Sequence, residues 1–142
     1  MNGGLDMQFD GINYIAIIAA TIVAFVIGAV FYSTLAKQWM KAVKIPEGQE
    51  PNMKPSLFAI TFVCQLVLAF MIAGVVGHLG EGQVTLSNGF ISGFFLWLGI
   101  IMPTMTINHR YQDFGWDLTI IDGLHWLLVA CAMGSVIGWF GV

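Results

Sequence analysis

The residues best suited to chemistry are Asp122 and His125, three positions apart in an otherwise apolar run. On a helix this spacing places both on one side, where a carboxylate can orient an imidazole. An ionisable residue inside a membrane costs at least a few kcal/mol unless it is paired or hydrated, which makes it a candidate functional site. The pair suits a structural polar cluster with Asn108, Tyr32 or Ser33, a binding or proton-handling site, or a catalytic pair. No nucleophile-and-base motif accompanies it, so we expect no catalytic residues and favour a protein that is not an enzyme.

The composition indicates which elements must position these residues. Of the 142 residues, 58% are hydrophobic and only 9% are charged. Soluble domains carry about 25% charged residues, so the chain is predicted to be an integral membrane protein surrounded by lipids. Its five basic residues are too few for a nucleic-acid-binding surface, and no nucleic-acid partner is expected.

The apolar runs predict an all-α fold, a polytopic four-transmembrane-helix bundle that forms a single domain over residues 1–142. About 20 apolar residues suffice to cross a bilayer as a helix. The expected helices cover residues 12–36, 55–78, 84–108 and 116–140. Pro103 lacks a backbone donor and should leave the Gly99 carbonyl free, so the third helix is predicted to be kinked.

Small residues recur at helical spacing and predict close packing between helices. Because four short helices bury little surface alone, we expect a homo-oligomer or an accessory subunit bound to a membrane-protein partner. The residues assigned to packing are Ala16, Ala20, Ala24, Gly28, Gly89, Gly93, Pro103, Gly134 and Gly138.

A second hypothesis is a small-solute or proton pathway, or a lipid- or ligand-binding pocket. Gln65 lies near the middle of its helix, and lipid cannot satisfy its amide, so it should face another helix or a hydrated cavity. A hydrogen bond between helices and a ligand contact both fit. The residues assigned to this site are Tyr32, Ser33, Gln65, Asn108, Asp122 and His125.

The basic residues predict the orientation, because cytoplasmic loops are enriched in Lys and Arg. Residues 37–54 contain four lysines, Arg110 lies between the third and fourth helices, and the other connections contain none. We therefore expect a multi-pass cell-membrane protein with the 37–54 loop in the cytoplasm and both termini outside, periplasmic or extracellular. The polar cluster around Asp122 then lies in the cytoplasmic half.

No metal or other cofactor is expected. His78, His109 and His125 fall at different depths, so one chain offers no facing pair of axial haem ligands. Cys64 and Cys131 lie in apolar runs without a CxxC motif and are predicted to be buried thiols.

Two blocks of the sequence resemble a small prokaryotic membrane family that is catalogued only as domain of unknown function number 1761. The first combines Gly28, Tyr32 and Ser33 with the later segment KQWM, and the second covers WLGIIMPTMTIN and the pattern W-x-L-x-x-I-D-G-x-x-W. The resemblance covers about residues 13–138 and supports the architecture without implying an activity. It also implies that the position of His125 is often aromatic in the family, which makes Asp122 the stronger candidate for a shared role.

Overall fold

The computed structural model describes residues 11–141, which form α-helices and one short π-helix and contain no strand. Four stretches are long and apolar enough to cross a membrane: α1, α3, the continuous run Leu86–Tyr111 and α6. The chain is therefore a multi-pass helical protein of the predicted class. In chain order its elements are α1 (Tyr14–Thr34), α2 (Ala36–Ala42), α3 (Pro55–Gly77), α4 (Leu86–Leu96), the π-helix η1 (Trp97–Ile101), α5 (Met102–Tyr111) and α6 (Trp116–Phe140).

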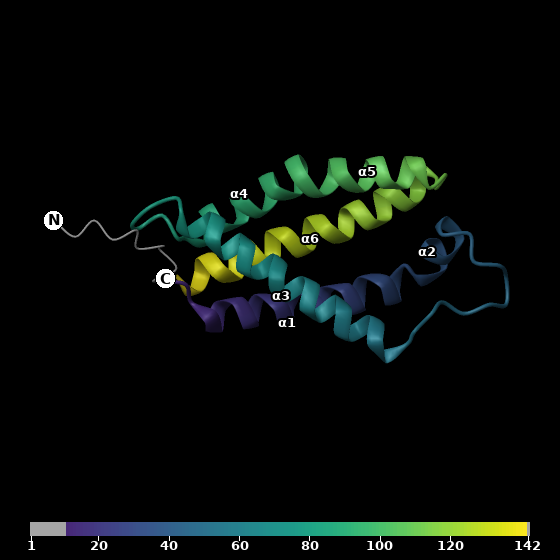
Figure 1. The fold of residues 1–142 in the computed structure, drawn as a ribbon, viewed down its shortest axis with the longest axis horizontal. Coiled ribbons are helices and arrows are strands. Elements are labelled where there is room, and N and C mark those ends of the chain that lie inside the picture. Colours follow the sequence, from purple (N-terminus) through teal and green to yellow (C-terminus); the bar gives the residue numbers. More distant parts are fainter. Residues whose placement is uncertain (1–10, 142) are drawn as a thin grey trace.

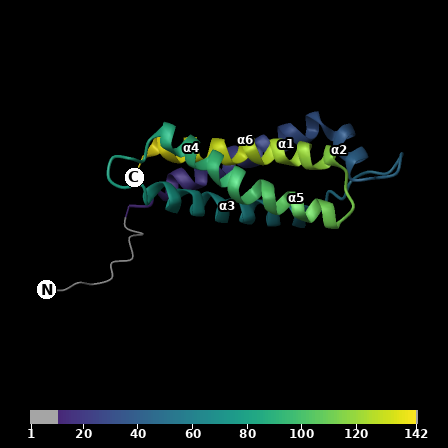
Figure 2. The ribbon, with the colours of Figure 1, turned by 90° about the horizontal axis from the view of Figure 1, so that it is seen from above.

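The four spans run side by side along the long axis of the molecule (Figures 1 and 2). α1 begins and α6 ends at one end, which we call the terminal end. α2, the loop that follows it and the turn between α5 and α6 lie at the other, which we call the basic end because all five Lys and Arg residues belong to these segments and their immediate borders. The basic side chains are thus gathered at one end.

Local signals in the sequence set several helix boundaries. The Asn13 side chain accepts a hydrogen bond from the Ala16 amide at 3.1 Å and caps α1. Thr85 caps α4 in the same way by accepting from the amide of Asn88 at 3.2 Å. Pro55 occupies the first turn of α3, where its missing amide hydrogen costs no intrahelical bond.

The third span changes its hydrogen-bond pattern where the sequence predicts a kink. The amide of Met102 donates to the Trp97 carbonyl five residues earlier, which is the spacing of a π-helix. Pro103 follows directly, in the first turn of α5. Because Pro103 has no amide hydrogen, α5 cannot continue the ladder of α4 without such an interruption.

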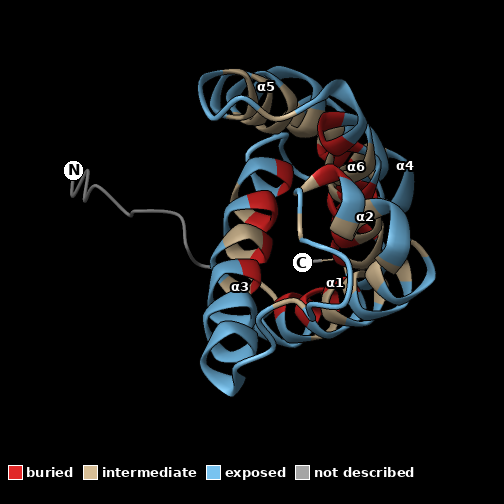
Figure 3. Ribbon diagram, turned by 90° about the vertical axis from the view of Figure 1, so that its right-hand side faces the viewer, coloured by how far each residue is buried: buried red, intermediate tan, exposed pale blue. Residues whose placement is uncertain are grey.

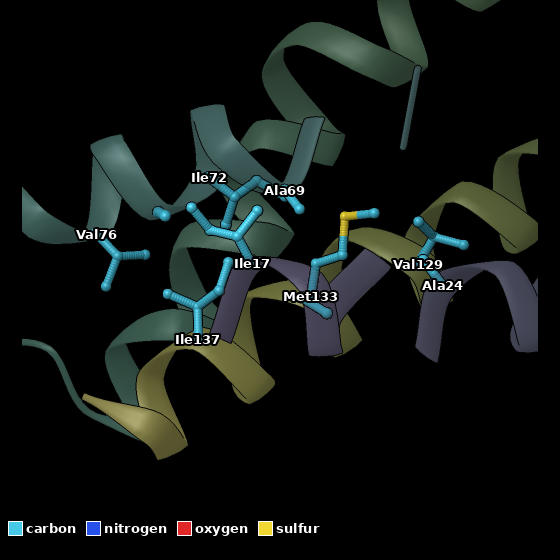
Figure 4. Close-up of a cluster of buried hydrophobic side chains, with 10 residues drawn as sticks. Ile17, Ala24, Ala69, Ile72, Val76, Val129, Met133 and Ile137 are labelled. Atoms are coloured by element: carbon cyan, nitrogen blue, oxygen red, sulfur yellow. The ribbon is translucent and has the colours of Figure 1, made fainter. Parts of the chain in front are cut away.

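The apolar core lies between α1, α3 and α6 in the terminal half of the bundle. Figure 4 shows α1 contributing Ile17 and Ala24 to this core, facing α3 and α6. Most core side chains are less than 5% exposed. Those labelled in Figure 4 from the other two helices are Ala69, Ile72 and Val76 of α3 and Val129, Met133 and Ile137 of α6.

α4 and α6 pack with their backbones in direct contact at several glycines. A side chain added at Gly89 would collide with the Gly134 carbonyl, and one at Gly93 would collide with the Ala130 carbonyl. One added at Gly138 would meet the Thr85 carbonyl. Only glycine permits this approach, so the GxxxG pair of α4 packs within the chain.

The basic half is more open than the terminal half. Residues 55–64 of α3 are exposed along their whole length, and Figures 1 and 3 show this part of α3 well separated from α5. None of the α5 residues is buried. α5 is therefore attached mainly to α6 and to the π-helix rather than enclosed by the bundle.

Candidate functional site

Asp122 is the centre of a polar cluster that joins three parts of the chain. The hydroxyl of Tyr32, in the last turns of α1, donates to Asp122 Oδ1 at 2.8 Å. Nε2 of His109, near the end of α5, lies 3.7 Å from Asp122 Oδ2. The indole of Trp39 in α2 lies beside Tyr32, with ring centroids 5.9 Å apart, and close to this carboxylate. A side chain in the second turn of α6 thereby meets partners from α1, α2 and α5.

The hairpin between α5 and α6 explains how His109 reaches this position. α5 ends at Tyr111 and α6 begins at Trp116, so residues at similar distances from the short turn face each other. Nδ1 of His109 lies 3.0 Å from the Thr119 hydroxyl oxygen, which fixes the orientation of the imidazole. The side chains of His109 and Asp122 are only 12% and 17% exposed.

Arg110 lies next to the cluster on the side of the basic end and binds the start of α6. Its guanidinium donates to the Gly115 carbonyl at 2.8 Å and to the Thr119 hydroxyl at 2.9 Å. The same group lies over the Trp116 ring, 4.2 Å from the ring centroid, in a cation–π contact. Arg110 is therefore engaged in holding the hairpin together.

His125 lies beside this cluster but forms no hydrogen bond with it. It is 4% exposed, and neither ring nitrogen has a hydrogen-bond partner. Three aromatic rings surround the imidazole, with centroids 5.6 Å away for Phe31, 4.7 Å for Tyr32 and 5.0 Å for Trp126. The expected orientation of His125 by Asp122 is not observed, because the carboxylate is occupied by Tyr32 and the other partners at the basic end.

The remaining residues assigned to the polar site lie elsewhere. Gln65 is 2% exposed and its Oε1 has no hydrogen-bond partner, but no contact joins it to Asp122. The Ser33 hydroxyl donates back to the Ala29 carbonyl of its own helix. Asn108 lines a groove on α5. The structure thus brings Tyr32 together with Asp122 and leaves these three outside the cluster.

Two partners of Asp122, His109 and Trp39, were not assigned to the site from the sequence. The short polar turn at residues 112–115 could have predicted the contact of His109. A short turn makes two helices antiparallel neighbours, so residues just before it lie near residues just after it. Trp39 follows α1 by only a few residues, so α2 returns it to the end of that helix, where its ring lies 5.9 Å from that of Tyr32.

A groove of about 430 Å³ runs beside the cluster, between α5 and α6. His109 belongs both to its wall and to the Asp122 cluster, so the two are continuous. The groove is lined by Ile100, Ile101, Thr104, Met105, Asn108, His109, Gln112 and Trp126.

The residues assigned to helix packing lie mostly at contacts within the chain. Ala16, Ala20 and Ala24 are buried on α1. Gly28 faces His125, since a side chain added there would lie 3.3 Å from His125 Nε2. Gly89, Gly93, Gly134 and Gly138 form the α4–α6 contact described above.

The two cysteines differ in exposure, and neither belongs to a metal site in the part of the chain that the structure describes. Cys131 is buried as expected, whereas Cys64 is exposed, because residues 55–64 of α3 lie outside the core. Among residues 11–141, no group of three or more His, Cys, Asp or Glu side chains is arranged to hold a metal ion.

The comparisons with known proteins identify a family for the chain. No curated protein and no solved structure matches it. Residues 15–138, which include every member of the Asp122 cluster, match the family described as protein of unknown function, DUF1761. Because the match covers most of the chain, this membrane protein belongs to the DUF1761 family.

Proposed function

We propose that the chain is a membrane-embedded binding protein that holds a small-molecule ligand in the groove beside the Asp122 cluster. The observation that carries the proposal is the double role of His109. Its imidazole lines the groove and lies 3.7 Å from the Asp122 carboxylate. A ligand in the groove would therefore contact a group that lies against Asp122 and, through Asp122, is linked to α1.

The cost of the cluster supports a functional role. Carboxylates and imidazoles are rare inside membrane spans because each must be paired or hydrated. The neighbouring α4–α6 contact is built from glycine and alanine without any charged group. Packing of this bundle therefore does not require an ionisable residue, which favours a role for Asp122 beyond holding helices together.

We propose that the cluster lies in the cytoplasmic half of the membrane. The basic end carries all five Lys and Arg residues, and such residues are retained on the cytoplasmic side. Both termini would then be outside the cytoplasm.

We propose binding without catalysis. The Thr119 hydroxyl lies 3.0 Å from His109 Nδ1, but it accepts a hydrogen bond from Arg110 and Thr119 is fully buried, which keeps this hydroxyl away from a substrate. Assembly into a homo-oligomer stays a separate prediction. The small-residue stripes no longer argue for it, because they are occupied within the chain.

Native mass spectrometry from mild detergent tests this function. We expect the wild-type protein to retain a molecule of defined mass and Asp122→Asn to lose it. Asp117→Asn is the matched control, since Asp117 is an exposed aspartate in the first turn of the same helix. If all three proteins retained the same molecules, or none, the proposal would be wrong and Asp122 would be a structural link.

A further inference from the structure

We infer that the ligand of this groove is an uncharged amphiphile, a molecule with an apolar chain and a head that carries hydroxyl or carbonyl groups. The inference rests on the proposed binding function and adds the class of ligand. It follows from the length of the groove, the order of polar and apolar residues along it, and the charges around it.

The groove has the length and direction of a lipid chain in one leaflet. Its wall extends from Ile100 in the π-helix η1 along α5 to Gln112, which corresponds to about 18 Å along a helix. Ile100 and Ile101 lie toward the middle of the third span, whereas Gln112 directly follows the end of α5 at the basic end. An apolar chain would therefore lie toward the middle of the membrane, and a polar head would lie at the basic end.

The charges around the groove disfavour an anionic head. His109 is the only ionisable residue in its wall, and Asp122 lies 3.7 Å behind it. While Asp122 is ionised, the pair is neutral or negative, so it never presents a net positive charge to a phosphate or carboxylate. Arg110 is not part of the groove wall, and its guanidinium is directed at the Gly115 carbonyl and the Thr119 hydroxyl instead.

Lys44 is also engaged away from the groove. Its amine donates to the Asp113 carbonyl at 2.7 Å and lies 3.8 Å from the carboxylate of the same residue. It lies 6.0 Å from the centroid of the Phe114 ring as well. Lys44 and Arg110, the basic side chains that contact the turn between α5 and α6, therefore have other partners.

The polar residues of the groove suit uncharged hydrogen-bonding groups. Asn108 and Gln112 each present an amide that both donates and accepts, and Thr104 adds a hydroxyl. Neutral donors and acceptors match hydroxyl and carbonyl groups, which occur on glycerol lipids and on quinones. Glycerol lipids and quinones therefore both offer uncharged oxygen atoms that can form hydrogen bonds with these side chains.

A ligand can enter this groove from the bilayer. Residues 55–64 of α3, the span that would otherwise cover this side, are exposed and stand apart from α5 (Figure 3). Thr104 and Asn108 are exposed in the chain, so no other span seals the wall of the groove. Lateral entry suits a molecule that is already dissolved in the membrane.

Quenching of Trp126 fluorescence tests the inference, because Trp126 lines the groove and bromine atoms on an acyl chain quench a nearby indole. Full-length protein in bilayers of unbrominated phosphatidylcholine would be titrated with a dibromostearoyl chain attached to glycerol, to phosphoglycerol or to a quaternary ammonium head. The Trp126→Phe protein supplies the signal of the other tryptophans for subtraction. We expect saturable quenching by the glycerol form, with at least tenfold weaker binding of both charged forms.

Two substitutions on α5 form a matched pair for this experiment. Thr104→Phe fills the groove and should weaken binding of the glycerol form at least tenfold. Ile107→Phe, at a position 57% exposed and outside the groove wall, should leave binding unchanged. A short-chain quinone and a monoacylglycerol would then compete with the brominated lipid. If the quinone displaces it at the lower concentration, the head belongs to the quinone class. If the monoacylglycerol does so, the head belongs to the glycerol class.

The outcomes separate this inference from the proposed function. Tighter binding of a charged form, lost in Asp122→Asn, would overturn the uncharged class and leave the binding function in place. Equal quenching by all three forms in every variant would indicate bulk lipid only and would overturn the inference. If no form showed saturable quenching while native mass spectrometry found an Asp122-dependent ligand, the groove would be the wrong location.

Discussion

The Tyr32 hydroxyl donates a hydrogen bond to Asp122 Oδ1 across 90 positions of sequence, and this 2.8 Å contact ties the basic end of α1 to α6. The bond supplies Oδ1 with a neutral donor, whereas His109 Nε2 lies 3.7 Å from Oδ2, beyond hydrogen-bond distance. Tyr32 is therefore the partner that holds Asp122 by a direct hydrogen bond.

Removing only this hydroxyl should weaken both the fold and the site. We expect Tyr32→Phe to lower the free energy of unfolding by about 1 kcal/mol, the order found for hydrogen bonds between membrane helices. Unfolding in mixed micelles measures the change. Tyr14→Phe is the control, because Tyr14 is 62% exposed at the opposite end of α1. Equal stability of the two variants would show that the bond contributes nothing.

His125 should tolerate replacement by an aromatic hydrocarbon. Its ring nitrogens have no hydrogen-bond partner and three aromatic rings surround it, so His125→Phe removes polar atoms from an apolar environment. We expect the melting temperature to stay the same or rise, because burying an unpaired polar group is unfavourable.

The same substitution at His109 should have the opposite result. His109→Phe leaves Asp122 without its imidazole partner, and we expect a loss of about 1 to 3 kcal/mol in unfolding free energy. Thermal unfolding of both variants in one detergent makes the comparison. A larger loss for His125→Phe than for His109→Phe would show that His125 has a polar partner essential to the fold.

The α4–α6 contact should depend on glycine. Gly89→Ala forces a side chain against the Gly134 carbonyl, and the helices must separate. We expect a loss of about 1 to 3 kcal/mol, typical of overpacking. Gly99→Ala is the matched control in the same span, because no atom lies within 4 Å of its added carbon. Thermal unfolding that ranked Gly99→Ala below Gly89→Ala would contradict the close backbone contact.

The orientation can be tested with single cysteines on a background in which Cys64 and Cys131 are replaced by serine and alanine. A membrane-impermeant maleimide added outside intact cells should label a cysteine at Glu81, in the turn after α3, and not one at Glu47, in the loop after α2. Lysis should make Glu47→Cys reactive. Labelling in the reverse order would place the basic end outside and contradict the cytoplasmic location of the site.

Helix number, class and the interruption near Pro103 were predictable because they depend on local composition. A run of apolar residues predicts a span wherever it packs, and proline disrupts a helical ladder in any context. Tyr32 was one of three partners that the sequence offered for Asp122, beside Asn108 and Ser33. All three could be named because the position of a residue along its span sets its depth in the membrane.

The other contacts of Asp122 depend on how each helix is rotated about its own axis, which the spacing of residues in the sequence does not determine. Asp122 and His125 share one side of α6, but the carboxylate contacts His109 and Tyr32 while the imidazole packs among rings. Asn108 and His109 are adjacent on α5, and only the second reaches Asp122. A difference of one position, about 100° around a helix, separates a member of the cluster from a residue of the groove alone.

The π-helix at Trp97–Ile101 divides the third span into parts with different freedom to vary during evolution. On the α4 side, Gly89 and Gly93 admit no side chain, because each lies against a carbonyl of α6. On the α5 side, no residue is buried, so the wall of the groove can change its side chains without disturbing the core. Substitutions of the exposed residues in the wall of the groove should therefore cost less stability than substitutions of Gly89 or Gly93.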